Sequence, residues 1–199
     1  MKILILLFLF FNLYAEELYS LRVAHGKASD SDLGEILYGD WQKRQYDFRV
    51  YALDGGYLLS KNIYDLPIDL YAKAGVAYFD EDSLQDDIYE VTLYIKAYYN
   101  IDFSDNRFRF GFGEGGSYTS DVLMCEYIDA NEKNDNYSRF LNYLDISFEL
   151  DFGRLINYKP LHNTYVGWTI KHRSGVFGLI NNVSHGGSNY NTFSIEKNF

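Results

Sequence analysis

The sequence is poor in cysteine, proline and basic residues. Its single cysteine, Cys125, excludes an intramolecular disulfide. No histidine lies near Cys125 in sequence, which favours a passive side chain over a nucleophile. Lysine and arginine total 18 against 28 aspartate and glutamate, for a net charge of −10, and this deficit argues against a nucleic-acid partner. The histidines at 25, 162 and 185 are scattered, so we expect no metal site and no cofactor.

Long apolar runs are also missing, except at the amino end, "MKILILLFLFFNLYA". Lys2 precedes an unbroken apolar run from Ile3 to Phe11, and the small residue Ala15 ends the segment, as in a secretory signal peptide. The alternative is a membrane anchor, but the run is too short to span a bilayer as a helix. We therefore expect a signal peptide over 1–15 and a single mature domain over 16–199. Loss of Lys2 would change the net charge from −10 to −11.

Aromatic residues are abundant, at 19% of the chain, and strict alternation of apolar and polar residues accompanies them. In 89–103, "YEVTLYIKAYYNIDF", the odd-numbered positions are apolar and most even-numbered ones are polar. A helix would spread these residues around its axis, whereas a strand separates them onto two faces. The sequence therefore predicts an all-β protein.

Eight segments carry a strand pattern, several of them long enough to cross a bilayer at a tilt. We expect a tight periplasmic turn at 104–106 and outer loops at 27–44, 120–143 and 177–188. A soluble β-sandwich or lipocalin-like barrel is the alternative. Three features favour an eight-stranded antiparallel transmembrane β-barrel of the outer membrane. The polar faces contain glycine, tyrosine and charges of both signs, which suits a small lumen filled by side chains. Aromatic residues also lie near the strand ends, and Phe199 is the terminal residue of a strand. The predicted strands are 18–26, 45–53, 66–79, 88–103, 107–119, 144–153, 163–176 and 189–199.

A histidine and a serine occur on one face of the seventh predicted strand, in "WTIKHRSG". Alternation places His172 and Ser174 with the apolar residues, facing lipid, and turns Lys171 and Arg173 into the lumen. Polar groups that face hydrocarbon are costly and indicate a function. With the amino end in the periplasm, both residues lie near the outer end of the strand. His172 as base and Ser174 as nucleophile would suit attack on the ester of a lipid acyl chain.

With its predicted export signal, eight strands, His-x-Ser on the penultimate strand and Asn182 eight residues after the serine, the chain resembles the outer-membrane lipid A 3-O-deacylase family. It is similar as well to the acyloxyacyl hydrolase-like relatives of that family. The motif likeness covers about 168–199, and elsewhere the likeness is of architecture. The resemblance implies a carboxylic ester hydrolase in the cell outer membrane, with lipid A, or lipopolysaccharide, as its substrate.

The resemblance also assigns roles to individual residues. His172 would be the base, Ser174 the nucleophile and Asn182 an oxyanion-hole residue. Where the compared family member has a glutamate to orient the histidine, this chain has Asn189, which can fix the imidazole tautomer but carries no negative charge. Where the family often has an asparagine directly after the serine, this chain has Gly175, whose backbone N–H could serve the oxyanion.

Two other functions remain open at the level of sequence. One is a non-enzymatic outer-membrane barrel, serving adhesion or membrane integrity, in which the His-x-Ser site is vestigial. The other is an outer-membrane phospholipase. The sequence assigns no oligomeric state.

Overall fold

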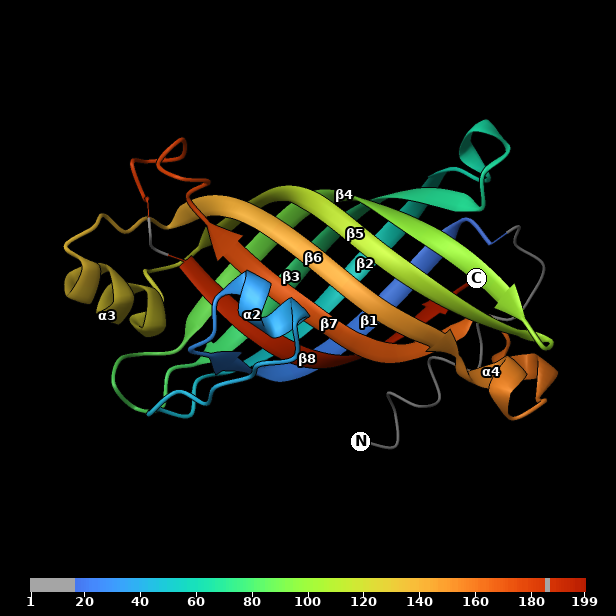
Figure 1. The fold of residues 1–199 in the computed structure, drawn as a ribbon, viewed down its shortest axis with the longest axis horizontal. Helices are drawn as coiled ribbons and strands as arrows, with labels where there is room; N and C mark the ends of the chain where they lie inside the picture. Colours follow the sequence, from blue (N-terminus) through green and yellow to red (C-terminus); the bar gives the residue numbers. More distant parts are fainter. Residues whose placement is uncertain (1–16, 185–186) are drawn as a thin grey trace.

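Eight antiparallel strands close into a barrel in the computed structural model, which describes residues 17–184 and 187–199 (Figure 1). Each strand pairs with its neighbour in sequence, and β1 also pairs with β8 to close the sheet. The signal peptide expected over 1–15 lies outside the described residues. The strands are β1 (Tyr19–Ser29), β2 (Arg49–Ser60), β3 (Ile68–Asp80), β4 (Ile88–Phe103), β5 (Asn106–Thr119), β6 (Phe140–Asp151), β7 (Thr164–Ser174) and β8 (Gly187–Asn198).

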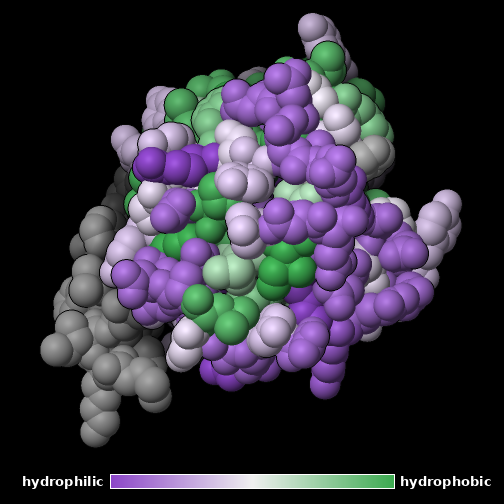
Figure 2. Space-filling model, turned by 90° about the vertical axis from the view of Figure 1, so that its left-hand side faces the viewer, coloured by the Kyte–Doolittle hydropathy of each residue, from purple (hydrophilic) through white to green (hydrophobic). Residues whose placement is uncertain are grey.

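Short helical segments lie in the connections between strands. They are α2 (Leu33–Leu37), η1 (Ile63–Asp65), α3 (Met124–Lys133), α4 (Phe152–Leu155) and η2 (Lys159–Leu161). Among the described residues, no helix is both long and apolar enough to cross a membrane. We call the end of the barrel with connections 30–48, 81–87, 120–139 and 175–184 the loop end, and the opposite end the turn end. The loop end presents a mainly hydrophilic surface with smaller hydrophobic patches (Figure 2).

The predicted alternation of faces is confirmed most clearly on β4. Leu93 is 71% exposed on the outside, whereas Tyr94 and Lys96, on the opposite face, are buried inside the barrel. A continuous apolar outer wall around a polar interior is the arrangement of a barrel in a bilayer rather than in water. The structure thus confirms the eight-stranded antiparallel transmembrane barrel expected from the sequence.

Ion pairs and tyrosine hydroxyls cross the lumen. The Arg22 guanidinium bonds Asp54 at 3.1 Å and also binds Asp145, while Lys73 bonds Glu196 at 2.7 Å. Tyr94 and Tyr98 donate hydroxyl hydrogen bonds to these carboxylates. Because buried charges are tolerated when they are paired and hydrogen-bonded, this network fills the interior without an excess of unpaired charge. It also ties non-adjacent strands together across the barrel.

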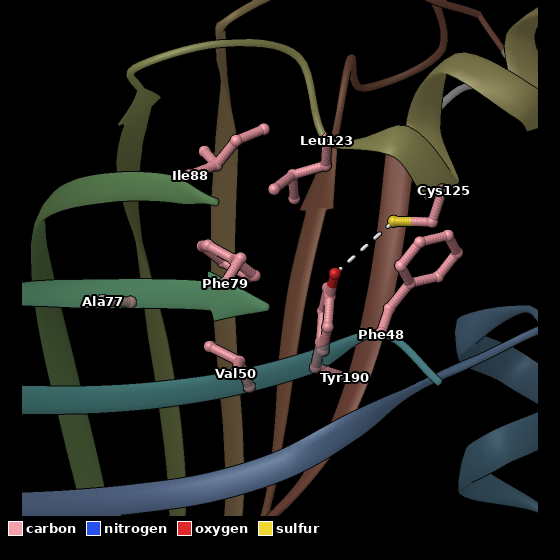
Figure 3. Packing of buried hydrophobic residues seen from close by; sticks show 8 residues of the cluster. All are labelled: Phe48, Val50, Ala77, Phe79, Ile88, Leu123, Cys125 and Tyr190. Carbon is pink, nitrogen blue, oxygen red and sulfur yellow. Dashed lines mark hydrogen bonds between the residues drawn. The ribbon is translucent and has the colours of Figure 1, made fainter. Parts of the chain in front are cut away.

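An apolar cluster lies inside the loop end (Figure 3). Leu123 and Cys125, at the start of α3, pack onto inward side chains of several strands, and the Cys125 thiol lies 3.5 Å from the Tyr190 hydroxyl. Burial raises the pKa of the Cys125 thiol to about 12, in keeping with a passive side chain. The cluster comprises Phe48, Val50, Ala77, Phe79, Ile88, Leu123, Cys125 and Tyr190.

Several predicted boundaries are wrong. The second strand was expected over 45–53, but β2 begins at Arg49 and continues through two glycines to Ser60. Gly56 pairs with Ser20 within the strand, and a Cβ there would approach the Ser20 hydroxyl to 2.4 Å, so a larger residue would displace that side chain. The sixth strand begins at Phe140 rather than 144. Two of the expected outer loops contain short helices, α2 and α3.

The tight turn expected at 104–106 is present as a two-residue connection. Ser104 and Asp105 have φ values of 44° and 62°, and Phe103 pairs with Asn106 on either side of them. Positive φ at both central residues matches the twist of the strands that the turn joins. The other turn-end connections are longer, since 61–67 contains η1 and 152–163 contains α4 and η2.

Candidate functional site

The outer face of β7 carries His172 and Ser174 at its loop end. In the sheet, His172 lies between Leu144 of β6 and Asn189 of β8. Both polar side chains are half-buried. The adjacent cations point the other way: Lys171 bonds Glu90 at 2.5 Å inside the lumen, and Arg173 is also buried. The facing predicted from alternation is therefore confirmed for all four residues.

Asn189 orients the imidazole. Its Oδ1 lies 2.7 Å from Nδ1 of His172, and its Nδ2 donates to the Ser31 carbonyl at 3.0 Å. Because the amide nitrogen is engaged with Ser31, the oxygen faces the ring, and the neutral imidazole carries its hydrogen on Nδ1. Nε2 is then left as a hydrogen-bond acceptor, the form that a general base requires.

A groove of about 630 Å³ on the outside of the barrel contains both residues. Its polar lining includes the side chains of Asn142 and Glu114 as well as His172 and Ser174. Its apolar lining comes from both strands and loops, namely Leu33, Phe112, Leu144, Val176 and Phe177. A polar pair within an apolar groove can hold an alkyl chain beside a reacting ester.

Ser174 and His172 are close but not bonded to each other. Side chains two residues apart on one strand face are separated by about 7 Å at Cβ. Within the described part of the chain, no hydrogen bond joins the Ser174 hydroxyl to the imidazole. Such contacts commonly tighten only when substrate is bound, so rotation of the two side chains would complete the pair.

The two residues expected to serve the oxyanion lie in different places. Gly175 follows Ser174, is buried and lines the groove. It can only be glycine, because a Cβ would approach the Val183 carbonyl oxygen to 2.1 Å. Asn182 is exposed at the far side of the same loop, where its carbonyl accepts a hydrogen bond from Asn136 at 3.0 Å. It is not among the residues that line the groove.

The connection between β1 and β2 forms a wall of the groove that was not predicted. Asp32, Leu33 and Gly34 line it at the start of α2, which lies against the outside of β6 and β7 (Figure 1). Ile36 of α2 is 1% exposed. A sequence signal for this short helix exists, since Asp32 is followed by a glutamate three residues later and by apolar residues at helical spacing.

Ile36 holds α2 in place by covering two outward residues. Ile146 and Ile170 point away from the lumen but are buried, because Ile36 packs on them. Trp41 adds a second contact, with its ring 5.1 Å from that of Trp168 and its Nε1 donating to the Ile36 carbonyl at 3.1 Å. The site is therefore built from strands and from a loop docked on their outer face.

Two acidic residues of the loop end share an ion pair with one arginine. The Arg44 guanidinium bonds Asp129 of α3 at 2.5 Å and Asp30 at 3.1 Å. The residues that the structure describes contain no group of three or more histidine, cysteine, aspartate or glutamate side chains that could hold a metal ion.

Comparison with known proteins shows similarity of fold. Neither a protein-family model nor a curated protein sequence matches the chain. The crystal structure of the outer membrane enzyme PagL matches with a TM-score of 0.58 and 14% identity, over 90% of this chain and 99% of that one. The crystal structure of Neisserial surface protein A (NspA) matches with a TM-score of 0.53 and 12% identity, over 92% of this chain and 98% of that one.

Proposed function

We propose that the protein is an outer-membrane esterase that removes an ester-linked acyl chain from lipid A. The observation that carries this proposal is the pair formed by His172 and Asn189. It leaves an imidazole nitrogen free to accept a proton, next to Ser174, in a groove on the outside of the barrel. A lipid could reach this groove sideways from the membrane without passing through the lumen.

The level of the groove along the barrel supports an ester in the outer leaflet as the target. Near the loop end, adjacent outward rings form a row from His25 through Tyr51 and Tyr78 to Tyr89, as expected for an aromatic girdle at the membrane interface. Asn189 pairs with Ser29 of β1, four residues beyond His25 toward the loop end. The groove therefore lies on the loop-end side of this aromatic row, and we take that side to face the lipid head groups.

The proposed reaction proceeds through an acyl-enzyme. Ser174 Oγ attacks the ester carbonyl while Nε2 of His172 accepts the hydroxyl proton, and the negative oxygen forms near the Gly175 N–H. The C–O bond to the lipid breaks, and His172 returns the proton to the departing alkoxide. Water then attacks the acyl-serine with His172 again as base, releasing a free carboxylic acid and regenerating Ser174. Asn182 would contribute only if the loop at 175–184 rearranged on substrate binding.

A second candidate is a non-enzymatic surface barrel. Asn189 is neutral where a triad has an acid, and one of the two structural neighbours is a surface protein while the other is an enzyme. The outer face of β7 would then bind lipid without cleaving it.

Lipid analysis distinguishes the two candidates. The protein is expressed in an outer membrane, and lipid A and phospholipids are examined by mass spectrometry beside Ser174→Ala and His172→Ala. Matched controls are Ser60→Ala, an exposed serine at the turn end, and His25→Ala, another outward histidine. If the protein is an esterase, lipid A should lose an acyl chain with wild type and both controls, but not with Ser174→Ala or His172→Ala. Unchanged lipid A with a correctly inserted barrel would reject it, and cleavage of phospholipid instead would reassign the substrate.

A further inference from the structure

The oriented imidazole lacks a charged partner on the barrel strands. When a base accepts the serine proton it becomes an imidazolium, which a neighbouring carboxylate stabilises, and in serine proteases replacement of that acid by an amide lowers kcat by about 10⁴. Asn189 supplies the hydrogen bond but not the charge. If the site works as proposed above, another group must supply the charge or the reaction must proceed without it.

Six charged side chains line the groove or the adjoining cavity that also contains His172. Two of the acids, Asp30 and Asp129, share an ion pair with Arg44, which offsets part of their charge. Glu114 faces outward on β5, in register with Leu144 and so one strand further from His172. The six are Asp30, Asp32, Arg44, Glu114, Asp129 and Lys133.

Asp32 is the acid with the most direct relation to the imidazole. It lines both cavities together with His172. Within the described residues, Asp32 forms no salt bridge of its own. The preceding residue, Ser31, accepts the hydrogen bond from Asn189. One segment therefore both holds the amide and carries the carboxylate.

The position of Asp32 is fixed from both sides. Glu35 accepts a hydrogen bond from the Asp32 backbone N–H at 2.9 Å. The Ser31 hydroxyl accepts one from the Gln42 N–H at 3.0 Å, and Ile36 anchors the following helix on the barrel. These contacts fix the backbone that carries the carboxylate, which reduces the reorganisation needed to stabilise a positive charge that forms nearby.

We propose that Asp32 is a positioning residue that provides the negative charge for the His172 imidazolium, because the neutral Asn189 cannot supply it. The two functions of a triad acid are thus divided between two segments. Asn189 of β8 fixes the tautomer by a direct hydrogen bond, and Asp32 of the β1–β2 connection acts through space. Since Asp32 is exposed, solvent and salt weaken its effect relative to that of a buried acid.

Kinetics of variants test whether Asn189 and Asp32 divide these two functions, and this experiment rests on the proposed esterase activity. Hydrolysis of an ester-containing lipid in mixed micelles is measured for wild type, Asp32→Asn, Asp32→Glu and the double variant Asp32→Asn/Asn189→Asp. We expect Asp32→Asn to lower kcat about tenfold with little change in KM, Asp32→Glu to retain most activity, and the double variant to recover it. The ratio of the wild-type kcat to the kcat of Asp32→Asn should fall at high salt. Asp40→Asn, which neutralises an exposed acid of the same connection, is the matched control.

A second measurement does not require activity. The imidazole of His172 is titrated by NMR in the inserted barrel, in a Ser174→Ala background. Asp32→Asn should move the titration midpoint of His172 to lower pH, and Asp40→Asn should move it less. No movement with Asp32→Asn would overturn the inference even if the protein is an esterase. A clear movement in a protein that cleaves no lipid would uphold the electrostatic pairing and reject the esterase instead.

Discussion

Arg173 lies between His172 and Ser174 in the sequence, and its Nε lies 2.9 Å from Oε1 of Glu126 inside the barrel. The guanidinium also donates to the Ser117 hydroxyl at 2.9 Å. A strand residue with an immobile inward side chain fixes the direction of its two neighbours, since alternate residues point to opposite faces. The lumen of the loop end thus holds the outward pair in place from behind.

Removal of this buried cation should destabilise the barrel. Arg173→Met leaves Glu126 without its ion pair, and we expect a loss of about 3–5 kcal/mol in the free energy of unfolding. The double variant Arg173→Met/Glu126→Gln should recover part of the loss. Urea unfolding in lipid vesicles measures both. As a control, Lys61→Met removes the exposed Lys61–Glu17 pair and should change the free energy of unfolding by less than about 1 kcal/mol. Equal losses for Arg173→Met and Lys61→Met would refute the argument.

Loss of the amide at 189 should impair catalysis while leaving the fold intact. Asn189→Leu removes the acceptor for Nδ1, so the imidazole is no longer held in the required tautomer and orientation. We expect kcat for ester hydrolysis to fall by about 10²-fold. Asn191→Leu is the control, because Asn191 also faces outward on β8 and accepts a hydrogen bond, but from Trp168 at 3.1 Å. Similar kinetics for the two variants would show that Asn189 has no special role.

Glu81 should make stability depend on pH. Burial raises its pKa, although Oε2 accepts hydrogen bonds from Met124 N–H at 2.7 Å and from Gln85 at 2.9 Å. A carboxyl whose pKa is raised by folding favours the protonated form. Its contribution to stability is therefore present below the pKa of the unfolded chain and is lost as pH rises through the folded value.

Glu81→Gln mimics the protonated state and tests this dependence. The variant should have a higher urea midpoint than wild type at pH 7, and the difference should disappear at pH 4 and below. Glu132→Gln, on an exposed part of α3, should show little difference at either pH. A Glu81→Gln variant less stable than wild type at pH 7 would mean that the ionised carboxylate is the stabilising form.

Docking of α2 should depend on Ile36. Ile36→Ala reduces its packing on Ile146 and Ile170, and we expect a cost of about 2 kcal/mol, which raises the undocked population roughly thirtyfold. Trypsin should then cleave faster at Lys43 in the barrel solubilised in detergent. Leu37→Ala, which alters an exposed neighbour, should leave the rate unchanged. If Ile36→Ala is cleaved no faster than wild type, α2 is held by other contacts, such as that of Trp41.

The sequence predicted those parts of the fold that depend on local alternation. On β4 and β7 the polar and apolar residues separate cleanly, so the lumen-facing Lys171 and the outward His172 could be assigned in advance. The same reasoning failed near the loop end of β2. There the apolar side chains Phe48 and Val50 point into the barrel, because Leu123 and Cys125 cover them from α3.

The surroundings of His172 could be predicted only in part. Asn189 could be matched because it lies on the strand next to β7. Asp32 could not, because its place beside the histidine results from closure of β1 onto β8 and from the docking of α2, and neither is encoded near residue 172. Such contacts depend on the assembled barrel rather than on any local pattern.

The crossed ion pairs of the lumen also have a kinetic consequence. A barrel filled by Arg22, Lys73 and their carboxylate partners leaves a lipid no axial route. For the proposed esterase, substrate and product would therefore exchange with the site by two-dimensional diffusion in the leaflet. Turnover would then follow the mole fraction of the ester lipid in the membrane surface rather than its bulk concentration. Dilution of that lipid into an inert bilayer at constant total amount should slow the reaction.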